Sequence, residues 1–166
     1  MAMNCEPGAS NERSYSGHYM KAGREGQMRK THIIIHHTDG DDGPAANIAS
    51  IRHWHKDHLN YADIGYHAVC ELVGEEYEII IGRDWDWDGA HTLGHNQTGF
   101  GFSFVGRFTD YEIPEAQLVR GVMGVRMIMK TLGIPPSAVF PHRQFNSTDC
   151  PGKLFPWDRF VKMIGG

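Results

Sequence analysis

The sequence predicts a single α/β domain with a central mixed sheet of about four to six strands, flanked by about three helices. Its 166 residues are 40% hydrophobic and 22% charged, which suits one globular domain with a core. Strand-like and helix-like segments follow one another after residue 30, without repeats or low-complexity tracts. Residues 1–28 are rich in Gly, Ser, Asn and charge and show no such period. We therefore expect an irregular N-terminal arm and one domain over residues 29–166.

Three segments have the character of β-strands. Residues 31–38, "THIIIHHT", are a β-branched run between polar residues, which is typical of a buried central strand, and place His36 and His37 on opposite faces. Residues 63–83, "DIGYHAVCELVGEEYEIIIGR", predict two strands joined at Gly74 and Glu75. Residues 99–108, "GFGFSFVGRF", alternate Phe with smaller residues and predict a fourth strand.

Three further segments predict helices. Residues 48–58 have one apolar stripe at helical spacing. Pro114 suits the first turn of a second helix, which runs to about Thr131 and ends at Gly133. The inner face of this helix is expected to comprise Leu118, Val122, Met123, Val125 and Met129. A last helix is expected from near Pro156.

Charge and composition exclude several classes of partner. The net charge of -4 disfavours nucleic acid, because that affinity comes largely from neutralised phosphates. Three cysteines, an odd number spread over the chain, do not form the framework of a disulfide-rich domain, so a reducing compartment is expected. No signal peptide and no membrane-spanning run are visible, so we expect no membrane insertion.

Three residues from two distant parts of the sequence suggest a metal site. His36 closes an apolar strand, and His142 lies in a segment that ends at Cys150. Two neutral imidazoles and one thiolate are a known ligand set for catalytic zinc, with the fourth position open. The spacing of His142 and Cys150 matches none of the common structural zinc patterns, so two alternatives remain. In the first alternative, Cys150 is a nucleophile and a histidine is its base. In the second, the three residues are unrelated to one another and belong to a loop and to the core.

Five stretches of the chain carry a family resemblance. They are, in order, "IIIHHT", "HWHKDHLNYADIGYH", "EEYEIIIGRDWDWDGAHTLGHN", "GFSFVGRF" and "HRQFNSTDCPG". From about residue 30 to residue 160, the chain resembles the zinc-dependent N-acetylmuramoyl-L-alanine amidases, whose fold is shared by bacteriophage amidase-type lysozymes and peptidoglycan recognition proteins. The resemblance covers about four fifths of the sequence. The resemblance implies hydrolysis of the amide between N-acetylmuramic acid and L-alanine in peptidoglycan.

The resemblance also assigns roles to single residues. It implies that His36, His142 and Cys150 bind Zn2+, that Tyr66 is a catalytic tyrosine, and that Thr148 lies near the reacting water. A threonine is too weak an acid to donate a proton, so Thr148 is expected to orient water. The proton for the leaving nitrogen comes either from that water or through Tyr66. Asp149, next to Cys150, remains an alternative ligand.

A second group of residues is expected to contact substrate. The segment "GAHTLGHN" contains His91 and Asn96, at a place where the family contacts glycan and stem peptide, and His67 follows Tyr66. Arg83 is a candidate partner for a stem-peptide carboxylate, and Trp85 for a sugar ring. Each has a structural alternative: a surface salt bridge for Arg83 and core packing for Trp85.

Three functional classes follow from these residues. The first is a zinc amidase that acts as a monomer on peptidoglycan, and the set of His36, His142, Cys150 and Tyr66 supports it.

 The second is a module that binds peptidoglycan without cutting it, and the third is a metal-free hydrolase with Cys150 as nucleophile. For the first class we expect a phage endolysin that stays in the host cytoplasm until lysis and then acts on the cell wall. A cytoplasmic amidase that recycles wall fragments is the alternative.

Overall fold

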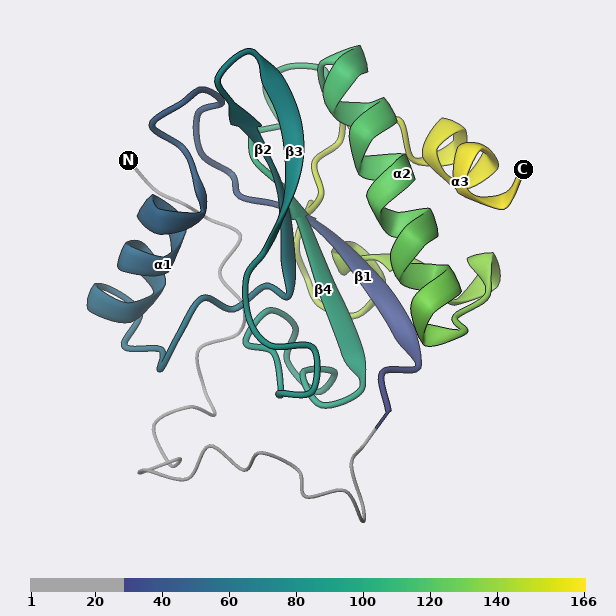
Figure 1. Ribbon diagram of the computed structural model, residues 1–166, viewed down its shortest axis with the longest axis horizontal. Helices are drawn as coiled ribbons and strands as arrows, with labels where there is room; N and C mark the ends of the chain where they lie inside the picture. The colour runs from purple at the N-terminus through teal and green to yellow at the C-terminus, as the bar shows by residue number, and fades with distance from the viewer. Residues whose placement is uncertain (1–28) are drawn as a thin grey trace.

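The centre of the fold is β1 (His32–His37), which is buried from Ile33 onward. In the computed structural model, which describes residues 29–166, β1 lies between β4 (Gly99–Phe104) and β5 (Val139–Pro141) and is parallel to both. β2 (Ala68–Val73) runs parallel to β4 and pairs antiparallel with β3 (Glu76–Ile81). The strand order β3-β2-β4-β1-β5 is a mixed five-stranded sheet, which confirms the predicted fold class (Figure 1). The predicted N-terminal arm, residues 1–28, lies outside the described residues.

The helices form a layer on each side of this sheet. α1 (Ile48–Asp57) lies on one side, and α2 (Glu115–Leu132) and α3 (Trp157–Gly165) lie together on the other (Figure 1). Two short 3-10 helices, η2 (Pro136–Ala138) and η3 (His142–Gln144), flank β5. The two layers therefore create two separate cores, one on each face of the sheet.

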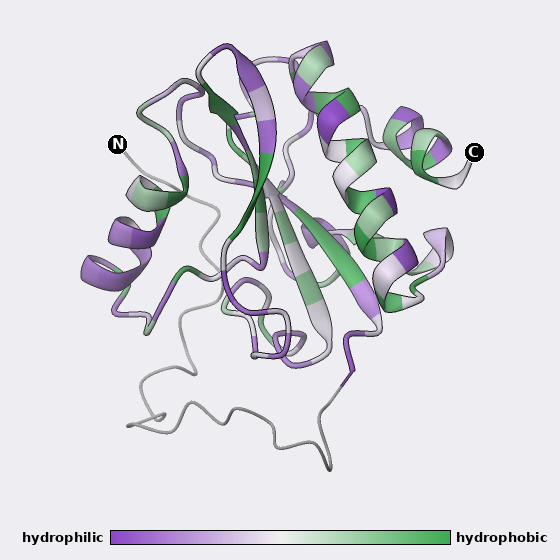
Figure 2. Ribbon diagram, in the orientation of Figure 1, coloured by the Kyte–Doolittle hydropathy of each residue, from purple (hydrophilic) through white to green (hydrophobic). Residues whose placement is uncertain are grey.

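The alternation of side chains along β1 divides its residues between these cores. Ile33 and Ile35 belong to the larger core, with the phenylalanines of β4 and the inner faces of α2 and α3. The smaller core contains Ile51 of α1, together with Ile64, Tyr66, Val69 and Val105. Figure 2 shows the hydrophobic residues concentrated on the central strands, whereas α1 is largely hydrophilic. His36, which alternates with Ile35, thus lies on the α1 side of the sheet.

The predicted hairpin and the end of α2 agree with the structure. β2 and β3 are joined at Gly74, which has a positive φ of 65°, and Gly133 ends α2 in the left-handed conformation. The prediction for Met123 was wrong, because its side chain is 58% exposed. Gly121 and Gly124 face the sheet instead, and a Cβ at Gly121 would lie 2.0 Å from the ring of Phe104. These glycines allow α2 to pack closely on the strands.

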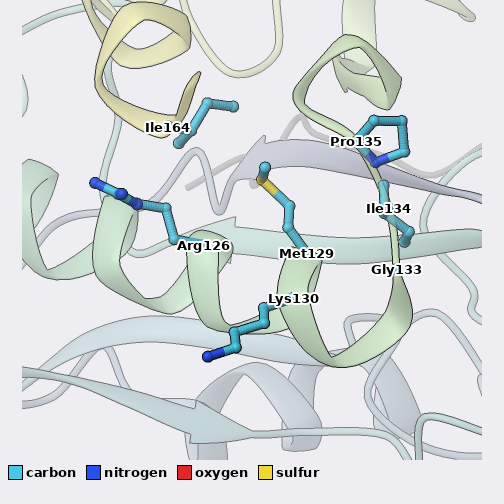
Figure 3. Close-up of a pocket in the computed structure, with 7 residues that line it drawn as sticks. All are labelled: Arg126, Met129, Lys130, Gly133, Ile134, Pro135 and Ile164. Atoms are coloured by element: carbon cyan, nitrogen blue, oxygen red, sulfur yellow. The ribbon is translucent and has the colours of Figure 1, made fainter. Parts of the chain in front are cut away.

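Among residues 29–166, no helix combines the length and the apolar character needed to cross a membrane. A pocket of about 350 Å³ lies at the end of α2 (Figure 3). It is lined by Arg126, Met129, Lys130, Gly133, Ile134, Pro135 and Ile164. None of the predicted site residues lines this pocket.

The buried His55 of α1 leads us to predict how the stability of the protein depends on pH. Its Nδ1 accepts a hydrogen bond from the Gly65 N–H at 2.9 Å, and burial, aided by Arg83, lowers its pKa to about 4. Between pH 6.5 and pH 4 the unfolded chain therefore binds a proton that the folded chain does not, so stability is lost as the pH falls through this window. In His55→Asn, whose amide oxygen retains an acceptor, the slope of unfolding free energy against pH should decrease by up to about 1.4 kcal/mol per pH unit.

Urea unfolding of both proteins with a chelator present, from pH 4.5 to pH 7.5, measures this difference. Above pH 6.5 the two stability curves should run parallel, separated only by the change in packing. Parallel curves over the whole range would contradict the assignment.

Candidate metal centre

Strand register brings the first two metal-ligand candidates together. β1 and β5 pair in parallel with Ile35 opposite Pro141, so the next residues along, His36 and His142, are neighbours. Their ring centroids are 4.5 Å apart, and both side chains are 1% exposed. The two histidines, separated by more than 100 residues in sequence, therefore meet at the carboxyl end of two parallel strands.

Cys150 completes the cluster. The ligand atoms of His36, His142 and Cys150 all lie within 4.8 Å of one another, and Cys150 is buried. The Sγ of Cys150 is 3.7 Å from the Nδ1 of His36. A tetrahedral ion with Zn–N near 2.0–2.1 Å and Zn–S near 2.3 Å requires a separation of about 3.6 Å between such atoms. Asp149, the alternative ligand, is exposed and is not part of the cluster found among residues 29–166.

The nitrogen that His142 offers is determined by its neighbour Asn146. The Nε2 of His142 lies 3.0 Å from the Oδ1 of Asn146, while the Nδ2 of Asn146 donates to the Phe145 carbonyl. An amide oxygen only accepts, so Nε2 carries the proton and Nδ1 carries the lone pair. This Nδ1 is buried and has no hydrogen-bond partner. A buried, unpartnered lone pair within a cluster of histidine and cysteine ligands suits a metal ion.

The loop that carries Cys150 is fixed by backbone hydrogen bonds. The N–H of His37 points at the Cys150 Sγ at 3.4 Å, and the Arg143 N–H donates to the Cys150 carbonyl at 2.9 Å. Gly152 has a φ of 103°, and a Cβ there would lie 2.4 Å from the backbone of Phe108. The Cys-Pro-Gly sequence thus lets the loop pass close to the Phe108 backbone while the sulfur faces β1.

The electrostatics favour neutral imidazoles. Burial lowers the pKa of His36 well below its usual value, and the neighbouring His142 and His91 lower it further. The pKa values of His67 and His91 are lowered in the same direction, again mainly by burial. Since the neutral ring is the form that binds metals, burial keeps His36 competent as a ligand.

The two residues predicted to be catalytic lie next to the cluster. The ring of Tyr66 is centred 5.2 Å from that of His36, and its side chain is 2% exposed. Thr148 is partly exposed, and its Oγ1 accepts a hydrogen bond from the Cys150 N–H at 3.2 Å. Both are therefore adjacent to a ligand, one through ring packing and one through the backbone.

Two of the predicted substrate contacts are buried below the cluster. His91 is 1% exposed, with its Nδ1 at 3.1 Å from the Nε2 of His36. His67 is fully buried, accepts from the Gly101 N–H and contacts the Trp87 carbonyl through Nε2. Asn96 is partly exposed, and its Oδ1 accepts from the N–H groups of His91 and Thr92. Asn96 therefore shapes the turn that carries His91.

The other two predicted contacts have structural partners. Arg83 is 3% exposed, and its guanidinium donates to the carbonyls of Asp63, Ile64 and Asp88. A contact with a substrate carboxylate would require these bonds to break. Trp85 is half-buried and packs edge-on against Phe100, with ring centroids 5.0 Å apart. The structure brings neither side chain to the metal cluster.

Sequence reasoning missed two residues that contact the ligands. Asn146 lies four positions after His142, a spacing that places side chains together in a helical turn and was a usable signal. Thr92 follows His91, and its hydroxyl is 3.3 Å from the Nε2 of His36. No local pattern marks Thr92, because its proximity to β1 depends on the path of the 84–98 loop.

Comparison with known proteins agrees with this geometry. Residues 26–153 match the family model for N-acetylmuramoyl-L-alanine amidase, Amidase_2. The chain belongs to this family. It is 40% identical over 146 residues to a human N-acetylmuramoyl-L-alanine amidase, covering 80% of this chain. The chain spans only about a quarter of the length of that relative.

Solved structures share the fold of this amidase-family chain. The amidase LysC from Clostridium intestinale, 25% identical, superposes with a TM-score of 0.71 over 84% of this chain and 89% of its own. A second structure from the same source, described as the endolysin LysCS, gives the same TM-score and covers 88% of that chain. The ectodomains of the peptidoglycan recognition proteins LCa and LCx, solved with tracheal cytotoxin, give 0.68 at 27% identity, over 78% of this chain and 80% of that chain.

The cluster predicts that zinc stabilises the folded protein. An ion that binds only the folded state should add about 4 kcal/mol at a free concentration of 1,000 Kd. Cys150→Ala should lose most of this increment, because the variant lacks one of the three ligands and only the two imidazoles remain. Thermal and urea unfolding of chelated and zinc-loaded protein measure it.

Cys70 provides the matched control. It is a second buried, free cysteine, and its Sγ contacts the Gln117 carbonyl in the larger core. Cys70→Ala should lower the stability of the chelated protein and retain the full zinc increment. Equal increments in the two alanine variants would contradict a role for Cys150 as ligand.

Proposed function

We propose that this chain is a zinc-dependent N-acetylmuramoyl-L-alanine amidase that cleaves the amide between N-acetylmuramic acid and L-alanine in peptidoglycan. One observation carries the proposal: a member of this family places one ligand atom each of His36, His142 and Cys150 within 4.8 Å of one another. Two imidazoles and a thiolate leave one tetrahedral position open, which is the arrangement of catalytic rather than structural zinc.

The chain's own residues supply the remaining parts of the reaction. A zinc ion bound here would supply Lewis-acid activation of water and of the scissile carbonyl. Tyr66, beside His36, is proposed to donate a hydrogen bond to the oxygen on which negative charge develops. The Thr148 hydroxyl already accepts from the Cys150 N–H, so its own hydrogen is proposed to orient the attacking water.

The proposed substrate is supported by two relatives. The human protein is an N-acetylmuramoyl-L-alanine amidase by name, and the LCa and LCx ectodomains were solved with tracheal cytotoxin. We propose that the reaction takes place on intact cell wall, as an endolysin released from the host cytoplasm, which the fold similarity to LysCS supports. Lysis of producing cells only when a membrane pore is opened is the result expected of an endolysin, whereas a recycling amidase should act only on soluble wall fragments.

The amidase activity is tested on purified sacculi. Zinc-loaded protein should release new L-alanine amino termini, chelation should abolish the release, and added zinc should restore it. Undiminished release without metal would favour Cys150 as a nucleophile. Binding to sacculi without any release would favour a non-catalytic module.

Tyr66→Phe tests the proposed hydrogen bond. Its rate should fall about 10²-fold, the usual cost of removing one donor from a developing oxyanion, while its zinc affinity stays unchanged. Tyr61→Phe is the matched control, because Tyr61 is also buried on the α1 side, where it packs against His55. Equal rates in the two variants would contradict the role of Tyr66.

A further inference from the structure

His91 lies directly behind the metal cluster, on the opposite side of the His36 ring. The Nδ1 of His36 faces Cys150, and its Nε2 faces the Nδ1 of His91 at 3.1 Å. The ring planes of the two histidines are nearly perpendicular, at 79°. In an edge-on contact of this kind, the N–H of one ring can donate a hydrogen bond to the nitrogen lone pair of the other ring.

The hydrogen bonds of His91 determine which of its nitrogens carries the proton. Its Nε2 faces the carbonyl of Gly99 at 3.4 Å, and a carbonyl oxygen only accepts. Nε2 is therefore the protonated nitrogen of this neutral ring, and Nδ1 carries the lone pair. Thr92 Oγ1 is 3.0 Å from the same Nδ1.

This arrangement fixes the tautomer of His36 as well. Two lone pairs 3.1 Å apart would repel, so the Nε2 of His36 must carry its proton and donate to His91 or to the Thr92 hydroxyl. The Nδ1 of a neutral His36 then holds its lone pair, on the side of Cys150. The tautomer of His36 that can bind a metal through Nδ1 is thus the one that donates a hydrogen bond from Nε2 to His91.

The ring of His91 lies close to the backbone of two glycines. A Cβ at Gly89 would lie 2.4 Å from the Cδ2 of His91, and a Cβ at Gly101 would lie 2.5 Å from the same atom. These two glycines provide the space that the ring fills. The backbone of His91 is tied to Asn96 Oδ1 at 2.8 Å.

Lys30 fixes the loop from the other side. Its ammonium is buried and donates to the carbonyls of Trp87, Asn96 and Gln97. The segment that carries His91 is therefore bonded at both of its ends. A loop built this tightly around a single buried imidazole is expected where the orientation of that imidazole matters.

From this geometry we propose that His91 is a positioning residue, which fixes His36 in the Nδ1 lone-pair form and orients it toward the metal. The proposal rests on the proposed zinc site and adds a residue to it. It assigns His91 a role through His36, and not through direct contact with substrate.

Metal affinity tests the proposal. His91→Leu fills the space but removes the acceptor, and its Kd for zinc should rise by about 10- to 100-fold in competition with a chromophoric chelator. His91→Asn places an amide oxygen near the position of Nδ1 and should retain most of the affinity. His55→Leu is the matched control, because His55 is also buried but contacts none of the three metal-ligand candidates, so the Kd of this variant should equal that of the wild type.

A second measurement does not depend on the stability of any variant. Two-bond 1H–15N correlation spectra of the metal-free wild type should show His36 protonated at Nε2, and His91→Leu should show a mixture of tautomers. A proton on Nδ1 of His36 in the wild type would overturn the proposal, as would wild-type zinc affinity in a folded His91→Leu. If the wild type itself binds no zinc, the proposed function fails instead, and the two failures are distinct.

Discussion

The parallel pairing of β1 with β5 determines where the candidate metal centre lies. β5 has only three residues, yet its register with β1 places Pro141 opposite Ile35 and so brings His142 beside His36. The alternation of β1 directs His36 to the α1 face while Ile33 and Ile35 anchor the strand in the larger core. The position of one ligand is thus a consequence of hydrophobic burial, and that of the second is a consequence of strand register.

Hydrogen bonds around the cluster select which atoms face its centre. Asn146 accepts a hydrogen bond from the Nε2–H of His142, and His91 or Thr92 accepts one from the Nε2–H of His36, so both rings present the lone pair of Nδ1. The His37 N–H points at the Cys150 sulfur and helps to hold it beside β1. Each ligand therefore has a partner within the protein, and the cluster can exist in the same geometry before a metal arrives.

The clustering of His36, His142 and Cys150 could be predicted from the sequence, because the motifs around these residues resemble a known family. β5 could not, since three residues that end in proline show no period to detect. The structural roles of Arg83 and His91 were also beyond sequence reasoning. Both depend on backbone carbonyls or on side chains from distant strands, and general rules place charged and titratable residues at the surface. Met123 was misplaced because glycines, which give no apolar signal, occupy the face of α2 nearest the sheet.

The central claim is that His36 and His142, both through Nδ1, and Cys150 bind one zinc ion. Anomalous diffraction at the zinc edge, from crystals of the zinc-loaded protein, tests it most directly. The account predicts one peak, about 2.0–2.1 Å from each Nδ1 and about 2.3 Å from the sulfur. A peak elsewhere, or one bonded to the Nε2 of either histidine, would contradict it.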